Sequence, residues 1–362
     1  MQIFIITKFK SNCWGHGGEK RTAQIRKLFE GERVSSIHLY NTQACLFTKL
    51  WYCIFPLKEL RFIYKEINIQ LSFIKKLIEN QRISREIILL KTTKTFVDSN
   101  LILWESTDIY QWYIPYLCKY LNKEIWAFPH NLESLVPNQG NSLNLNEWLY
   151  IEIAYLKKCN RIFTISKEEN WLIETLGGES EILPYYPPIE VEKLLLTCRD
   201  KRIETKNKEY IFFIIGTAGN PPTYAGLQEL IKYIQSQEWP SKITFKVAGF
   251  GTDIFKSQIW SNQIEILGAI SNDQLNVHLQ ECSAVIINQK TSSGALTKII
   301  ELLIAGVPII CNHGSARSYY EYDGIYIYNN IKNLKKLILN YFLENKIIVK
   351  KPILESSINF HQ

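Results

Sequence analysis

Short runs of consecutive apolar residues, separated by turns or helical patterns, are the feature that most constrains the fold of this chain. Strands covered by helices on both faces of a parallel sheet have this composition. Helical patterns at 223–237, 272–281 and 295–305 lie between the later runs, and one at 330–345 follows the last run. The alternation predicts an α/β protein with two Rossmann-like domains, each a doubly wound parallel sheet. The apolar runs are 2–7, 85–92, 100–106, 124–130, 161–166, 210–216, 243–251, 264–270, 283–289, 307–312 and 324–329.

The composition marks a boundary between the two halves. The 362 residues, of which 46% are hydrophobic, exceed what one compact core usually holds. The stretch LPYYPPIEV (183–191) is rich in proline and cannot continue a helix. The charged stretch 198–209 has no apolar period. We therefore predict an N-terminal domain over 1–190, a linker over 191–209 and a C-terminal domain over 210–345. The tail, 346–362, is a candidate to cross back to the N-terminal domain.

Charge and cysteine usage narrow the class of protein. The net charge of +7 favours phosphate-bearing partners or an anionic membrane face. The basic residues form no continuous stripe with stacking aromatics, so a nucleic-acid partner is not predicted. The eight cysteines form no CxxC pair and several lie in apolar runs, which predicts reduced core residues and a cytoplasmic location.

The sequence predicts neither a signal peptide nor a membrane-spanning helix. No basic segment precedes the first apolar run, so this run is predicted to be a strand rather than a signal peptide. No run of about 20 apolar residues occurs, so we predict no membrane span.

The segment TSSGALTKIIELLIAGVPII, 291–310, carries polar residues that a purely structural helix does not need. A helix that starts after a Ser- and Gly-rich turn presents free N–H groups to a phosphate. Ser292 or Ser293 is a candidate helix cap, and Gly294 lets a ligand approach the backbone. Lys298 adds a point charge, and the Glu301 carboxylate, three residues on, can accept hydrogen bonds from a ribose diol. The structural alternative is a solvated Lys–Glu pair.

This segment resembles the donor-nucleotide segment of GT-B glycosyltransferases of the retaining, family-4-like group. A frequent form there is Gly-x-x-x-Lys-x-x-Glu, then a small residue, Gly, x-Pro and a strand. Gly294, Lys298 and Glu301 match it, followed by Ala305, Gly306 and Pro308. The first Glu of the family's E-x7-E pair is Ser293 here, which removes a carboxylate near the transferred sugar. Backbone amides at Ser292 to Ala295 are the substitute that we expect.

Three further segments match the donor side of the family in order. The loop IIGTAGNPPTYAG presents Gly216, Gly219 and Asn220 for a diphosphate, and no Arg or Lys occurs between Gly216 and Gly226. That absence departs from many relatives and leaves Lys298 as the main charge partner. The segments VAGFG and LGAIS are expected to line the nucleotide site through Gly249, Gly251, Gly268 and Ile270.

The N-terminal half is expected to bind the acceptor. The stretch WGHGGEKR places His16, Gly17 and Gly18 between the first apolar run and a helix, with Lys20 and Arg21 as further candidates. Its structural alternative is a solvated basic turn. His130 follows a buried run at the edge where open α/β sheets bind ligands, and the resemblance places it against the donor sugar. Asn131 and Glu133 are polar neighbours, and Glu105 and Asp108 are weaker candidates.

The stretch 44–86 combines aliphatic, aromatic and basic residues. Such a face can rest on an anionic membrane and receive a lipid-linked acceptor. The alternative is a helix packed on the sheet, with lysines whose stems cover apolar surface.

These observations predict a hexosyltransferase-type enzyme that moves a sugar from a nucleotide-sugar donor to a saccharide or lipid-linked acceptor in glycan or cell-surface polysaccharide synthesis. The donor is expected in the cleft between the two domains, and by resemblance the anomeric configuration is retained. Lys298, Glu301 and His130 are the candidate catalytic residues. No metal-ligand cluster appears, so we expect metal independence and no cofactor. The alternatives are a nucleotide-sugar epimerase of the GT-B fold and a non-catalytic nucleotide-sugar-binding relative.

Overall fold

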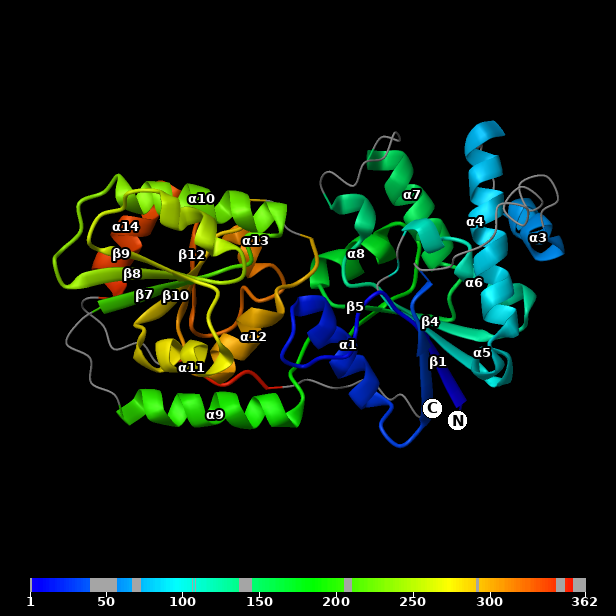
Figure 1. The fold of residues 1–362 in the computed structure, drawn as a ribbon, viewed down its shortest axis with the longest axis horizontal. Coiled ribbons are helices and arrows are strands. Elements are labelled where there is room, and N and C mark those ends of the chain that lie inside the picture. Colours follow the sequence, from blue (N-terminus) through cyan, green and yellow to red (C-terminus); the bar gives the residue numbers. More distant parts are fainter. Residues whose placement is uncertain are drawn as a thin grey trace. The chain divides into compact units, whose positions relative to one another are not determined.

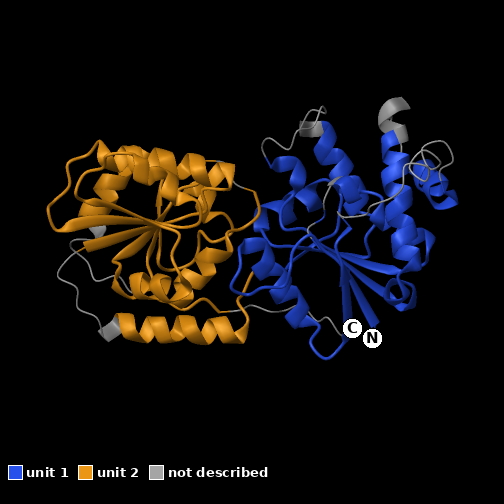
Figure 2. Ribbon diagram, in the orientation of Figure 1, with its two compact units in different colours: residues 1–184, 358–362 blue, residues 185–357 orange. Residues whose placement is uncertain are grey.

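The computed structural model describes residues 2–39, 57–66, 73–105, 107, 109–136, 145–204, 210–290, 293–342 and 349–353. These residues form two compact units, of which unit 1 runs to Pro184 and unit 2 begins at Tyr185 (Figures 1 and 2). The expected return of the tail to the N-terminal domain concerns residues that lie mostly outside the described ranges, and it stays a prediction.

Unit 1 is built on a parallel sheet of six strands in the order β2-β1-β3-β4-β5-β6. Its strands are β1 (Gln2–Ile6), β2 (Arg33–Ile37), β3 (Leu101–Glu105), β4 (Glu124–Phe128), β5 (Arg161–Thr164) and β6 (Glu181–Ile182). Its α-helices are α1 (Gly17–Leu28), α3 (Lys58–Glu66), α4 (Phe73–Thr92), α5 (Lys94–Asp98), α6 (Ile114–Tyr120), α7 (Leu145–Leu156) and α8 (Lys167–Thr175).

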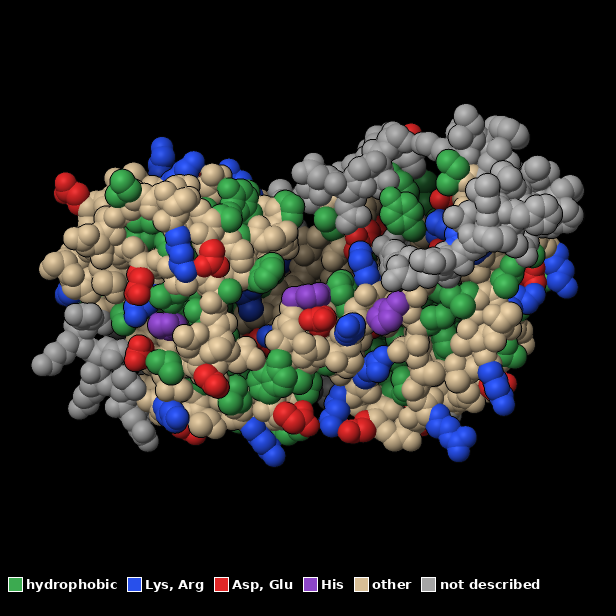
Figure 3. Space-filling view, in the orientation of Figure 1, with side chains coloured by type: hydrophobic (Ala, Val, Ile, Leu, Met, Phe, Trp, Pro, Cys, Tyr) green, Lys and Arg blue, Asp and Glu red, His purple; other side chains and the backbone are tan. Residues whose placement is uncertain are grey.

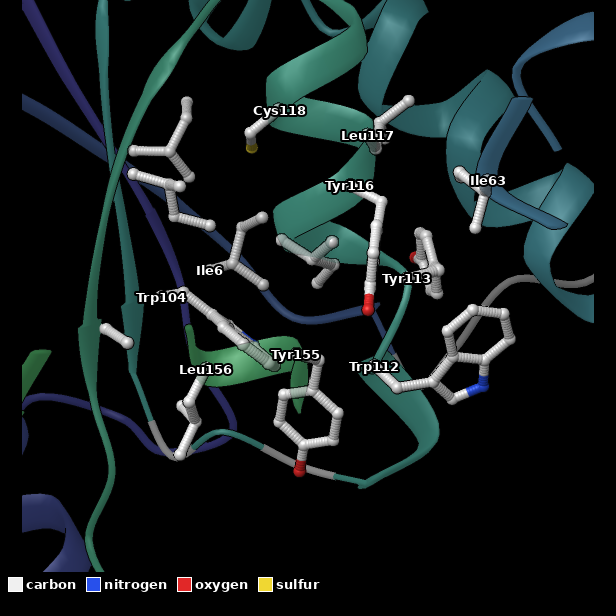
Figure 4. Close-up of a cluster of buried hydrophobic side chains, with 14 of the residues drawn as sticks. Ile6, Ile63, Trp104, Trp112, Tyr113, Tyr116, Leu117, Cys118, Tyr155 and Leu156 are labelled. Atoms are coloured by element: carbon white, nitrogen blue, oxygen red, sulfur yellow. The ribbon is translucent and has the colours of Figure 1, made fainter. Parts of the chain in front are cut away.

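Alternate residues of the unit 1 strands pack into two separate cores, one on each face of the sheet. Phe4 and Ile6 of β1 belong to a cluster that includes Trp104, Leu117 and Leu156, which Figure 4 shows in part. The alternate residues of β1, Ile3 and Ile5, pack instead with Ile25 and Phe29 at α1. Successive strand residues face opposite sides, so burial of both sets explains why these strands are continuous apolar runs.

Unit 2 repeats the architecture with the strand order β12-β11-β10-β7-β8-β9, again all parallel. Figure 1 shows α10 on one side of this sheet and α9, α11 and α12 on the other. The strands are β7 (Tyr210–Ile215), β8 (Ile243–Ala248), β9 (Ile264–Gly268), β10 (Ala284–Ile287), β11 (Ile309–Asn312) and β12 (Ile325–Tyr328). The α-helices are α9 (Ile189–Glu204), α10 (Pro221–Gln235), α11 (Asn272–Glu281), α12 (Thr297–Ile304), α13 (His313–Ala316) and α14 (Leu334–Leu337).

Most of the expected strands are confirmed, and one is wrong. The run 85–92 belongs to helix α4, because Ile83, Ile87 and Leu90 recur at helical spacing and are all buried. Strand β2 was not expected, since its RVSSI sequence is half polar and lies at the sheet edge. The two-residue edge strand β6 was also not expected.

The expectation of a linker over 191–209 is wrong for most of its length, because helix α9 occupies it. Two arginines fasten α9 to the rest of unit 2. Arg199 donates from Nε to the carbonyl of Ile304 at 2.7 Å, at the carboxyl end of α12. Arg202 donates from Nη1 to the carbonyl of Cys282 at 2.8 Å, directly after α11. Helix-end carbonyls have no partner within their own helix, so these contacts make α9 an integral part of unit 2.

Candidate functional site

Strand order fixes where each unit can bind a ligand. In open parallel sheets, ligands bind beyond the carboxyl ends of the strands, where neighbouring crossovers leave in opposite directions. In unit 2 this point lies between β7 and β10, and in unit 1 it lies between β1 and β3. The loops after these strands contain Gly216 to Asn220, Ser293 to Ala295 and His16, whereas His130 follows β4 and the other glycines that the sequence singled out in unit 2 lie at the ends of β8 and β9.

The loop after β7 is held by backbone contacts to the loop after β8. Ala218 donates its N–H to the carbonyl of Phe250 at 2.8 Å. Gly216 is buried, and a Cβ there would lie 2.8 Å from the side chain of Thr223, so packing accounts for this glycine. Gly219 and Asn220 are exposed, and a Cβ on Gly219 would meet nothing closer than 3.9 Å. Packing therefore does not require a glycine at 219.

The glycines at the ends of β8 and β9 have conformations that side chains avoid. Gly249 has φ +137°, and a Cβ there would lie 1.9 Å from the carbonyl oxygen of Gly216. Gly251 and Gly268 also have positive φ, and Asp253 occupies the space beside Gly268. The expected donor segments thus lie together at the carboxyl edge of the sheet, with Ile270 half-buried just after β9.

Helix α12 begins later than expected. It starts at Thr297, and its N-cap residue Leu296 makes no side-chain capping bond, so capping by Ser293 is wrong. Ser292 lies outside the described residues. Gly294 is buried with φ +65° and turns the chain toward the helix, and Ser293 and Ala295 are half-buried beside it. This turn needs the left-handed conformation, which glycine adopts readily.

The Lys298 ammonium group lies at the switch point of unit 2. Its Nζ donates to the carbonyl oxygen of Ile215, the last residue of β7, at 3.5 Å. The side chain is half-buried rather than extended into solvent. A positive charge at the end of β7, close to the loop of Gly216 to Asn220, is suited to a diphosphate.

Glu301 is held by a tyrosine that the sequence did not single out. The buried Tyr185 hydroxyl donates to Glu301 Oε1 at 2.7 Å. Glu301 is itself half-buried, so neither it nor Lys298 behaves as part of a solvated surface pair. Tyr185 lies within the Pro-rich stretch that served only as a boundary mark, and no local pattern connects it to a helix more than 100 residues away.

Aromatic and carboxylate contacts assemble the site of unit 1. The His130 ring stacks on Phe9, with ring centroids 5.2 Å apart and an interplanar angle of 9°. His16 meets the same phenylalanine edge-on at 5.1 Å. His130 Nε2 lies 2.9 Å from Glu105 Oε1, which also accepts from the Thr22 hydroxyl. The residues around His130 come from the ends of β1, β3 and β4 and from α1.

The turn before α1 is ordered by its own side chains. His16 is the N-cap, and its Nδ1 accepts from the N–H of Gly18 at 3.2 Å, while Glu19 accepts from the N–H of His16. Gly17 is the first helical residue. Arg21 is buried and donates to Gln24 and to the carbonyl of Pro184, so its expected role in touching an acceptor is wrong.

A second buried carboxylate fixes the loop that follows His130. Asn131 donates to Glu133 Oε1 at 2.9 Å. Glu152 of α7 accepts from the backbone N–H groups of Glu133 and Ser134, both at 2.8 Å. Burial raises the pKa of Glu152 to about 7. Sequence analysis did not identify Glu152, because nothing near it in the chain indicates the contact.

Several expectations cannot be placed on the structure. Asp108 lies outside the described residues, as do 44–56 and 67–72 of the proposed membrane-facing stretch. Within that stretch, Arg82 pairs with Glu79 and Glu86. Figure 3 shows Lys and Arg side chains interspersed with Asp and Glu over the face that it draws.

The described residues contain no group of three or more His, Cys, Asp or Glu side chains that could hold a metal ion. No helix among them is long and apolar enough to cross a membrane.

The fold is similar to those of solved proteins of low sequence identity. HepE from Anabaena, solved with UDP and also with UDP-glucose, has a TM-score of 0.62 in its UDP complex at 12% identity, covering 94% of this chain and 89% of that one. WaaG, described as a glycosyltransferase involved in lipopolysaccharide biosynthesis, has a TM-score of 0.54 at 9% identity, covering 93% and 89%.

An epimerase shares the architecture as well. UDP-GlcNAc 2-epimerase from Methanocaldococcus jannaschii, solved with UDP-GlcNAc and UDP, has a TM-score of 0.50 at 14% identity, covering 97% of this chain and 95% of that one. No protein-family model matches the sequence, and no curated protein matches it either. The likeness establishes the fold: two Rossmann-like units of the GT-B type.

Proposed function

We propose that this protein is a glycosyltransferase that takes its sugar from a nucleotide-sugar donor. Unit 2 binds the nucleotide at the carboxyl ends of β7 and β10, with Lys298 at the diphosphate and Glu301 at the ribose. Unit 1 contributes His130 to the transferred sugar, and Asn131 and Glu133 to the acceptor. Catalysis consists mainly of positioning and of stabilising the negative charge on the departing diphosphate.

One observation carries this proposal: the Lys298 ammonium lies beside the last carbonyl of β7, at the switch point of a doubly wound sheet. Structures of the same fold were solved with UDP or UDP-glucose, as in HepE, which supports a nucleotide-sugar donor and makes UDP the first nucleotide to test.

The test measures the binding of UDP, ADP and GDP to the whole protein by thermal shift and by calorimetry. A ligand that binds the native state raises the melting temperature in proportion to the logarithm of its concentration over Kd. We expect one nucleoside diphosphate to stabilise the protein, and Lys298→Ala to weaken its binding at least tenfold. Lys232→Ala, at an exposed position in the last turn of α10, is the matched control. Equal binding by the two variants would contradict the assignment of Lys298.

The finer features of the reaction are proposed from the sequence resemblance. The anomeric configuration is retained, no metal or cofactor takes part, and the acceptor is a saccharide or a lipid-linked glycan of cell-surface polysaccharide synthesis. We propose a cytoplasmic enzyme that contacts the inner face of a membrane through 44–86. Product stereochemistry tests retention, and activity in EDTA tests metal independence.

Two other functions are favoured by specific observations. Ser293, in place of a glutamate, and the lack of Arg or Lys between Gly216 and Gly226 favour a binding protein without transfer activity. The likeness to the UDP-GlcNAc 2-epimerase favours epimerisation. An epimerase converts its nucleotide sugar with no acceptor present, whereas a binding protein leaves it unchanged. Incubation with UDP-GlcNAc alone therefore separates these functions.

A further inference from the structure

A buried carboxylate in unit 1 has one oxygen that no described residue satisfies. Glu105 is buried at the carboxyl end of β3, and its Oε1 accepts from Thr22 and from His130. Its Oε2 is also buried, yet it has no hydrogen-bond partner in the described part of the chain. Burying an unsatisfied carboxylate oxygen costs free energy, and such groups in native proteins often belong to functional sites.

The geometry assigns the two nitrogens of His130 different tasks. Nε2 lies 2.9 Å from Glu105 Oε1, so the ring proton is assigned to Nε2, where it is donated to the carboxylate. Nδ1 has no hydrogen-bond partner among the described residues. In a neutral imidazole with its proton on Nε2, Nδ1 carries the lone pair and acts only as an acceptor.

The surroundings of His130 restrict how the ring can move. Its side chain is 11% exposed, and stacking on Phe9 fixes the plane of the ring. Thr107, two residues beyond Glu105, has a buried hydroxyl that also has no partner within the described ranges. Unsatisfied polar atoms thus gather after β3, beside the switch point at which a ligand is expected.

We propose that Glu105 is a positioning residue that keeps the His130 proton on Nε2, so that Nδ1 accepts a hydrogen bond from a hydroxyl group of a bound sugar. The sugar as ligand rests on the proposed function, whereas the position of the proton does not. If Glu105 served only for packing, an apolar side chain of similar size would fill the site at a lower cost in free energy, because it would bury no charge.

The position of the proton is tested by NMR on the whole protein with 15N-labelled histidine. The resonances of His130 are those missing from His130→Asn. For the neutral form of the His130 ring in the wild-type protein, we expect the proton on Nε2 and none on Nδ1. Glu105→Leu should shift the proton toward Nδ1 or give a mixture, whereas Glu105→Gln, which keeps an acceptor oxygen, should retain the wild-type pattern.

The wild-type spectrum alone can overturn the proposal, even if Glu105→Leu does not fold. A proton on Nδ1 of the neutral ring in the wild-type protein contradicts it, and so does an unchanged pattern in folded Glu105→Leu. Glu86→Gln, which replaces another buried carboxylate of unit 1 that is bound to Arg82 and Tyr113, is the control and should leave the His130 resonances in place.

The hydroxyl contact is tested by calorimetry with UDP and UDP-glucose. We expect Glu105→Leu and His130→Asn to weaken UDP-glucose relative to UDP by roughly tenfold, the effect of losing one hydrogen bond. Glu86→Gln should leave the ratio unchanged. An unchanged ratio in Glu105→Leu and His130→Asn overturns the sugar contact. If the wild-type protein binds neither compound, the proposed donor fails, and the NMR result still decides the role of Glu105.

Discussion

At the scale of single residues, two glycines in the loops of unit 2 differ in whether a side chain could replace them. A methyl group on Gly249 would collide with the backbone carbonyl of Gly216, at a φ that favours glycine, whereas a methyl group on Gly219 would meet its neighbours only at ordinary contact distances of 3.9 and 4.0 Å. We expect Gly249→Ala to lower the free energy of unfolding by more than about 2 kcal/mol. Gly219→Ala, the matched control, should change it by less than about 0.5 kcal/mol. Urea denaturation measures both, and equal effects would contradict the described loop geometry.

Glu152 gives stability a dependence on pH. Burial raises its pKa from 4.5 to about 7, so the native state disfavours the charged form. The contribution of this group to stability is therefore full below pH 4.5 and is lost as pH rises through about 7, by at most roughly 3 kcal/mol.

Glu152→Gln should flatten the pH dependence of unfolding between pH 5 and 8. The exposed Glu179→Gln should leave it as in the wild-type protein. Melting temperatures recorded across this pH range make the comparison. If the curve of Glu152→Gln is as steep as that of the wild-type protein, Glu152 is not the source of the pH dependence.

Sequence patterns located some site residues and could not locate their partners. Lys298 and Glu301 follow from a local spacing, and His130 follows from its place after an apolar run. Tyr185, Phe9, Thr22 and Glu152 touch the site residues only after the chain has folded. A contact such as that of Tyr185 with Glu301 joins residues 116 apart, and no periodicity of the sequence encodes it.

At the scale of elements, helix α9 depends on two arginines. Arg202 donates to the carbonyls of Cys282 and Gly306, which follow α11 and α12. Removing it leaves these carbonyls without a charged partner. We expect Arg202→Ala to lower the free energy of unfolding by about 1–3 kcal/mol. Lys201→Ala, at an exposed position next to it on the same helix, should cost under about 0.5 kcal/mol. Chemical denaturation followed by circular dichroism distinguishes them.

The same helix shows why some elements were missed. The α9 sequence has apolar residues on several sides of the helix. The helical spacing of its buried residues, Val191, Leu195 and Cys198, therefore does not stand out from the sequence alone. The prediction of a strand over 85–92 was wrong for a related reason, since a short aliphatic run fits a strand and a buried helix equally well. The central strands, whose two faces are both covered, were recognised because burial on both sides leaves no polar position.

At the scale of the whole molecule, each unit has its own sheet and core, and unit 2 begins earlier than the sequence suggested. We expect a fragment over 185–357 to unfold cooperatively and to bind the same nucleoside diphosphate as the whole protein. A fragment that starts at 210 lacks α9 and Tyr185 and should be less stable. Calorimetric melting of the two fragments tests this, and equal stability would show that α9 is dispensable.

Hydrogen bonds hold the last residue of unit 1, Pro184, and the first residue of unit 2, Tyr185, each within its own unit. The carbonyl of Pro184 accepts from Gln24 at 2.9 Å, and the phenol of the next residue, Tyr185, donates to Glu301. The peptide bond between Pro184 and Tyr185 therefore joins two residues that are each held by a side chain of their own unit. Residues inserted at this bond would form a loop between two fixed ends and would leave both contacts in place.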